Sequence, residues 1–149
     1  MTTLRDFLAA CDAAIRTHLD ANEQVLAVGR CEDITESGSI DQGGAAWTYL
    51  MVTNRRVRWV PHSLGLEASL DFDDVTAVSE RSVRHRYAIA LEHAPLTRPH
   101  WAPAHRFLFL EWGNAVVNRP VTRTEFAFSR RDTEAALALR EQLARQRGL

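Results

Sequence analysis

The chain has 149 residues, 46% of them hydrophobic and 25% charged, and its formal net charge is −1. This balance is typical of a globular domain with one core, and it excludes a largely disordered chain or a bundle of membrane spans. Because the net charge is close to zero, no overall field attracts nucleic acid or an anionic bilayer, and such binding would need a local patch.

The first segment, residues 1–21, carries apolar side chains at spacings of three and four, which predicts an amphipathic helix. Thr3 with Asp6 predicts its cap, and Asn22 predicts its end. The apolar stripe is too large to stay in water, so we expect it to pack on the rest of the chain or against another copy. Its members are Leu4, Phe7, Leu8, Cys11, Ile15 and Leu19.

The same segment contains acidic residues and lacks a long apolar run, which is typical of neither a signal peptide nor a membrane anchor. We therefore expect no transmembrane segment and a cytoplasmic location. Cys11 falls on the helical stripe and Cys31 near the end of a predicted strand. We expect both thiols to be reduced and to pack as small apolar side chains rather than to form a disulfide.

Short segments of strand character fill the middle of the chain and predict antiparallel strands joined by turns. These segments are 23–31, 45–53, 56–62, two within 66–80, 84–93, 105–112 and 124–128. The acidic, glycine-rich segment 32–44 predicts a long hairpin loop, and segment 94–104, with three prolines, predicts a second loop. The segment 45–53 is apolar on both faces and predicts a central strand.

Residues 51–60 read MVTNRRVRWV and predict a hairpin that turns at Asn54, a residue that tolerates unusual backbone angles. After the turn, apolar residues alternate with Arg56 and Arg58, which is the period of a strand with one buried and one solvated face. We therefore expect Arg56 and Arg58 to face water, beside Trp59.

A second helix is predicted at the C-terminal end, in residues 130–147, with Ala136, Leu139 and Leu143 on one face. The whole pattern predicts a mainly β fold with flanking helices (α+β). We expect an antiparallel barrel or sandwich of about seven strands, preceded by the N-terminal helix and capped by the C-terminal helix.

The order of three segments along the chain resembles that in the bacterial pleckstrin-homology-like (PH-like) domains, including the GRAM-related type. They are ANEQVLAVG at 21–29, YLMVTNRRVRWV at 49–60 and LDFDDVTAVSE at 70–80, followed by a strand and a closing helix. The resemblance covers residues 22–147. It implies a barrel of antiparallel strands, with the C-terminal helix plugging one end.

On this resemblance the chain divides into the helix 1–21 and a PH-like domain 22–149. In eukaryotic members of the family, the loop between the first two strands binds phosphoinositides through basic residues. Here that loop carries several acids and no basic residue after Arg30. Because unpaired acids repel a phosphate, we expect no phosphoinositide headgroup to bind there.

The segment 93–105 is rich in histidine, and His93, His100 and His105 raise the alternative of a metal site, because imidazoles bind zinc well. Their spacing matches no familiar ligand pattern. The competing interpretation is that they are polar loop residues. Zinc retained near stoichiometry after dialysis would favour a small-molecule- or metal-binding protein, or an enzyme, that uses this segment.

The acidic group Asp71, Asp73 and Asp74 could supply paired carboxylates for acid-base chemistry or hold a divalent cation. The competing interpretation is an ordinary bend between strands, with its acids facing water. The sequence has no nucleophile elbow, phosphate loop or HExxH pattern. We therefore expect no catalysis and no cofactor.

A basic strip would form if the hairpin at 51–60 lay beside the hairpin that contains Arg81, Arg84 and Arg86. Such a strip could bind single-stranded nucleic acid. The acids Glu80 and Glu92 and the near-neutral charge disfavour this partner. We expect a non-catalytic module that presents a strand edge, or a groove beside its C-terminal helix, to a protein or peptide partner or to a second copy. The candidate binding residues are Arg55, Arg56, Arg58, Trp59, Arg84 and Arg86.

Overall fold

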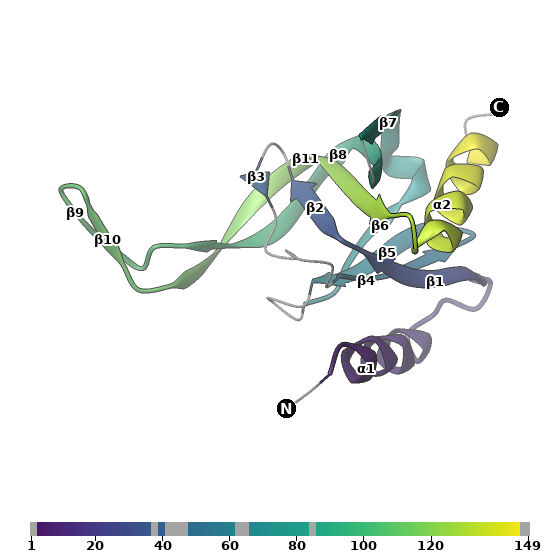
Figure 1. The fold of residues 1–149 in the computed structure, drawn as a ribbon, viewed down its shortest axis with the longest axis horizontal. Helices are drawn as coiled ribbons and strands as arrows, with labels where there is room; N and C mark the ends of the chain where they lie inside the picture. Colours follow the sequence, from purple (N-terminus) through teal and green to yellow (C-terminus); the bar gives the residue numbers. More distant parts are fainter. Residues whose placement is uncertain (1–2, 37–38, 41–47, 62–65, 84–85, 147–149) are drawn as a thin grey trace.

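The computed structural model describes residues 3–36, 39–40, 48–61, 66–83 and 86–146. Two antiparallel sheets form the body, a helix lies near each end of the chain, and a two-stranded ribbon projects from the body (Figure 1). The prediction of a mainly β fold with flanking helices is confirmed. Within the described residues neither sheet closes on itself.

The first sheet has the strand order β1 (Val25–Cys31), β4 (Thr48–Thr53), β5 (Arg56–Pro61) and β6 (Ala68–Asp71). Every residue of β4 is buried, because this strand lies between two others and both of its faces are covered. The prediction of a central strand here is confirmed. The hairpin turns at Asn54, also as predicted.

The second sheet has the strand order β3 (Ser39–Ile40), β2 (Asp33–Glu36), β11 (Ala115–Ser129), β8 (Arg86–Ala102) and β7 (Val75–Val83). Only Glu32 separates β1 from β2, so the chain passes directly from the first sheet to the second. At that crossing the Glu32 N–H donates to the Ala127 carbonyl of β11 at 2.8 Å.

The prediction of one long loop at 32–44 is therefore wrong for residues 33–36, which form β2 and pair with β11, and for residues 39–40, which form β3 and pair with β2. Residues 37–38 and 41–44 lie outside the described residues. The acids at the end of β6 do form a bend, as expected. Asp71, Asp73 and Asp74 are exposed around a 3-10 turn (Phe72–Asp74) whose phenylalanine is buried.

The core lies between the two sheets and is closed at one end by α2 (Thr133–Gln146). Trp59 of the first sheet meets Phe126 of the second edge-to-face, with ring centroids 5.2 Å apart. Gly29 allows α2 to approach β1 closely, because a Cβ at that position would lie 3.1 Å from the Cβ of Ala135. The predicted apolar face of this helix is confirmed, with Ala136, Leu139 and Leu143 all buried.

The N-terminal helix α1 (Leu4–Arg16) packs on the outer face of the first sheet. Its cap is confirmed, since the Thr3 hydroxyl accepts from the Asp6 N–H at 3.1 Å. The predicted end at Asn22 is wrong: the helix stops at Arg16, where the Thr17 hydroxyl donates to the Ala14 carbonyl at 2.6 Å. The buried side chains of the stripe contact residues of the same chain, namely Tyr49, Met51 and Val60.

Both cysteines are buried and neither is in a disulfide, as predicted. In the part of the chain that the structure describes, no helix is long and apolar enough to cross a membrane.

The segment 94–104, predicted as a loop from its prolines, instead continues β8 to Ala102. β7 pairs with β8 only as far as His93, so beyond that point β11 is the one strand of the described chain that pairs with β8. In a two-stranded ribbon the outward N–H groups need no protein partner, so Pro95 and Pro99 are tolerated.

We call residues 94–121 the arm. It ends in a hairpin of β9 (His105–Phe107) and β10 (Leu110–Trp112), which we call the tip. Figure 1 shows the tip at the far end of the molecule from α2.

The packing of α1 can be tested by mutation. Ile15 is 2% exposed because it packs on the first sheet, so Ile15→Ala leaves a cavity. The free energy of unfolding, measured by urea titration, should fall by about 3 kcal/mol. Arg5→Ala, on the exposed side of the helix, is the control and should cost less than about 0.5 kcal/mol. Equal, small effects of both changes would show that the helix is not docked.

Candidate functional site

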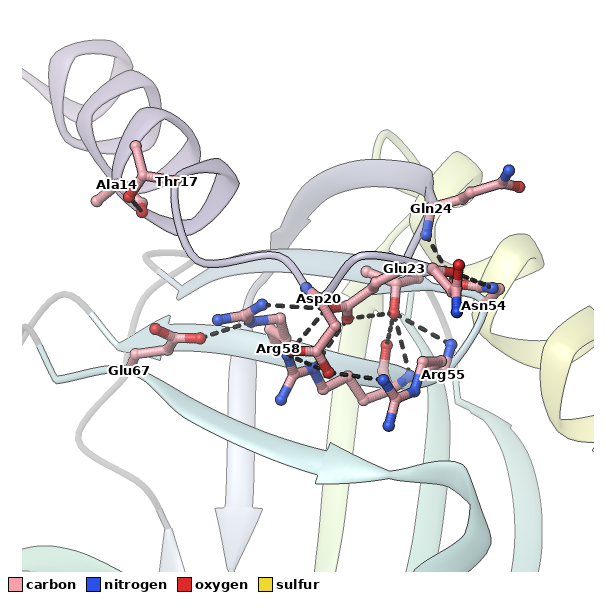
Figure 2. A network of polar contacts seen from close by, with 12 residues as sticks. Ala14, Thr17, Asp20, Glu23, Gln24, Asn54, Arg55, Arg58 and Glu67 are labelled. Carbon is pink, nitrogen blue, oxygen red and sulfur yellow. Dashed lines mark hydrogen bonds and ion pairs between the residues drawn. The ribbon is translucent and has the colours of Figure 1, made fainter.

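The arginines of the β4–β5 hairpin form ion pairs inside the protein. Arg56 binds the Glu23 carboxylate through two hydrogen bonds of 2.8 Å, and the Thr53 hydroxyl donates to the same carboxylate at 2.7 Å. Arg58 lies 3.5 Å from Glu23 and donates to Glu67 at 2.6 Å. Figure 2 shows this network where the segment after α1 crosses the hairpin.

Asn54 and Arg55 attach the same crossing segment to the hairpin. The Asn54 side chain accepts from the Gln24 N–H at 2.7 Å and donates to the Asn22 carbonyl at 3.1 Å. Arg55, which is half exposed, pairs with Asp20 at 2.6 Å. The turn residues therefore hold the connection between α1 and β1 in place.

The expectation that Arg58 faces water is wrong. Arg58 is 4% exposed, because α1 and the segment that follows it cover the face that strand periodicity predicted to be solvated. Arg56 is also largely covered, with 19% of its side chain exposed. Trp59 is fully buried in the core, so it cannot offer a flat apolar surface to a partner.

The other predicted arginines do not join this hairpin. Arg86 is on the second sheet and pairs with Glu32 at 3.0 Å and Asp33 at 2.6 Å. Arg81 pairs with Glu125 of the same sheet at 2.6 Å. Arg84 lies outside the described residues. The described arginines of the two groups thus lie on different sheets with separate acidic partners, and they do not form one continuous basic strip.

The Glu23 carboxylate is held as an anion. The hydrogen bonds from Arg56 are the largest cause and lower its pKa to about 2, the Thr53 hydroxyl acts in the same direction, and burial opposes both. A carboxylate whose pKa falls on folding stabilises the folded state above its unfolded pKa, and this stabilisation is lost as the pH falls through the folded pKa. Glu23 should therefore stabilise the fold at neutral pH and lose that effect toward pH 2.

Replacing Glu23 by Gln tests this structural role. The change leaves Arg56 and Arg58 without their shared counter-charge, so the free energy of unfolding at pH 7 should fall by about 3 kcal/mol. The difference between wild type and variant should narrow as the pH is lowered below about 5. Asp20→Asn, at a half-exposed pair with Arg55, is the control and should cost at most about 1 kcal/mol. A penalty that is independent of pH would contradict the ionic role.

The three histidines of the predicted loop lie in three different settings. His93 is buried, with one ring nitrogen 2.9 Å from the Thr124 hydroxyl. His100 is buried, 3.9 Å from the Glu36 carboxylate. His105 is exposed on the tip and stacks on Trp112, with ring centroids 5.4 Å apart. Among the described residues, no group of three or more His, Cys, Asp or Glu side chains could hold a metal ion.

A buried charge pair lies where the arm joins the body. Arg98 of β8 donates to Glu36 of β2 at 3.0 Å, and both side chains are almost completely buried. The Arg98 guanidinium also lies 5.5 Å from the centre of the Trp59 ring. Since Trp59 belongs to the first sheet, this contact ties the root of the arm to both sheets.

The most exposed apolar residues of the described chain lie on the tip. The sequence predicts one continuous strand over 105–112, with phenylalanine and leucine alternating at 107–110. The structure instead places these residues in a turn and two short strands, all exposed. The exposed fractions are 64% for Phe107, 77% for Leu108, 99% for Phe109, 67% for Leu110 and 52% for Trp112.

A second apolar surface is a groove beside α2, with a volume of about 310 Å³. Tyr87, Phe128, Ala136 and Leu137 are among its lining residues. The predicted groove beside the C-terminal helix is therefore present, whereas the sequence does not predict the tip as a site. The signal that could have identified the tip is a short apolar run preceded by Pro103 and followed by Gly113.

Comparison of the chain with family models, with curated proteins and with solved structures finds no match.

Proposed function

We propose that the protein is a non-catalytic binding or assembly module, which recognises a protein or peptide partner or a second copy of itself through the tip of the arm. The observation that carries this proposal is the exposure of five large apolar side chains within residues 107–112. Proteins rarely expose a contiguous apolar patch of this kind unless it binds something, and aromatic residues are enriched where proteins meet.

The proposal replaces the hairpin surface as the place of contact. Arg58 and Trp59 are buried, and Arg56 is engaged by Glu23, so these side chains serve the fold. On the tip the reverse holds, because Phe109 and Leu108 have almost no neighbours to cover them. An apolar side chain that is exposed in the free protein loses no packing when it moves into an interface.

The same proposal retains a PH-like fold for residues 22–149. Three features support it: a first strand that passes from one sheet to the other, a hairpin turning at Asn54, and a C-terminal helix over one end of the core. The arm is an extension of the hairpin between β8 and β11. In this proposal the sandwich is a scaffold, and the arm carries the binding surface.

The experiment compares three immobilised baits in an extract of the native host: wild type, Phe107→Ser/Phe109→Ser, and Leu137→Ser. Leu137 is 58% exposed on α2, so its replacement is a matched loss of exposed apolar surface elsewhere. We expect wild type and Leu137→Ser to retain the same proteins, and the tip variant to lose them. The proposal is contradicted if all three baits retain the same proteins, or if only Leu137→Ser loses them.

A further inference from the structure

We propose that the occupant of the tip is a second copy of this chain, and that two tips pack face to face about a two-fold axis. This inference rests on the proposed function and names its partner. It follows from the way side chains are distributed over the hairpin, from the area they expose and from the charges beside them.

The register of the hairpin gathers its apolar side chains on one face. Phe107 is opposite Leu110, and His105 is opposite Trp112, so these four side chains point to the same side. Arg106 and Glu111 are opposite each other between those pairs and point to the other side, where they form an ion pair of 2.6 Å. The tip therefore has one apolar face, one charged face, and two apolar residues at its turn.

The exposed area of the tip is close to what a stable interface needs. Taking about 200 Å² for a large apolar side chain, the exposed fractions at the tip correspond to roughly 700 Å². The largest apolar patch on a typical monomer is about 300–600 Å², and a standard interface buries about 800 Å² on each partner. This area includes the turn residues Leu108 and Phe109, so two tips reach the standard range, at roughly 1,400 Å² in total, when both the apolar faces and the turns are covered.

The turn gives an independent indication. Leu108 has a φ of 54°, in the left-handed region, where a leucine is strained and glycine or asparagine is not. The turn thus holds an apolar side chain at a position where the backbone disfavours it. Strained positions of this kind cluster at functional sites.

Charge distinguishes a second copy from a lipid bilayer. Residues 105–112 contain one arginine and one glutamate, so with neutral histidine their formal charge is zero, and they offer no attraction to anionic lipid. Insertion into hydrocarbon would also bury the Arg106–Glu111 pair, which is costly. In a face-to-face dimer the charged faces stay outside in water.

Sedimentation equilibrium of the purified full-length protein over a range of concentrations tests the inference. We expect wild type to be a monomer–dimer system with no larger species, because an isologous contact closes on itself. Phe107→Ser, on the apolar face, and Phe109→Ser, at the turn, should each weaken the dimer at least about tenfold, because large aromatic side chains that become buried dominate the energy of an interface. Leu137→Ser, the matched control on α2, should leave the dimer constant unchanged.

Leu108→Gly separates binding from folding. Glycine relieves the strained turn, so the melting temperature should not fall, whereas the loss of the exposed leucine should weaken the dimer at least about threefold. A variant that loses the dimer without losing stability excludes misfolding as the cause. A Leu108→Gly dimer as tight as wild type would overturn the tip-to-tip contact.

Three other outcomes would also overturn the inference. A wild-type protein that stays monomeric at all concentrations would overturn the dimer. If the tip still captured proteins from the extract in that case, the proposed function would stand. Open-ended oligomers that Leu137→Ser disperses would place the tip in the groove beside α2 of another copy. Tip-dependent co-sedimentation of a monomer with vesicles of anionic phospholipid would make the bilayer the occupant.

Discussion

The pairing of β8 with β11 continues well past the point at which both strands lose their other neighbours, and the rest of the structure depends on it. From Arg86–Ser129 to Glu92–Arg123, the pair forms the centre of the second sheet and contributes Ile89, Leu91 and Phe126 to the core. From Leu96–Val121 outward, the same pair has no third strand in the described structure. One continuous ribbon therefore supplies both the buried framework and the exposed tip.

Buried ion pairs connect the ribbon and the hairpin to the rest of the body, and the exposed apolar residues lie at the tip. Arg98 and Glu36 join β8 to β2 below the arm, with Trp59 of the first sheet against the guanidinium. Arg56 and Glu23 join the hairpin to the segment after α1. Removing one partner of such a pair is destabilising because it leaves a buried charge unpaired, whereas replacing both partners by well-packed apolar groups can cost little. We therefore interpret these pairs chiefly as fixing relative geometry.

The sequence predicted the elements well and their surroundings less well. Periodicity identified α1, α2 and a central strand within 45–53, and residue type identified the turn at Asn54, because these patterns depend on neighbours in sequence. It could not show that Arg58 is buried, because Glu23, which accompanies it, belongs to a segment that covers the strand only in the folded chain. Strand alternation indicates two faces and does not say which of them another element covers.

The errors in the arm have the same origin. Pro95 and Pro99 indicate a loop only if each strand has partners on both sides, and in a two-stranded ribbon that condition fails. Phe107 and Phe109 indicate a buried strand only if a second layer covers them, and the described chain supplies none. The number of strands or layers that neighbour a residue depends on the whole fold. Local sequence patterns therefore gave the wrong surroundings for these residues.

The central claim, that the tip of the arm is where two copies meet, is tested most directly by a distance measured between copies. Cys11 and Cys31 are both buried, so a spin label attached to Asn114→Cys, at an exposed position beside the tip, should react selectively. With one label per chain, any dipolar coupling above background arises between copies. Our account predicts a defined short distance that disappears when labelled protein is mixed with an excess of unlabelled protein. A signal containing only the background of separated molecules, at concentrations where the protein is a dimer, would contradict it.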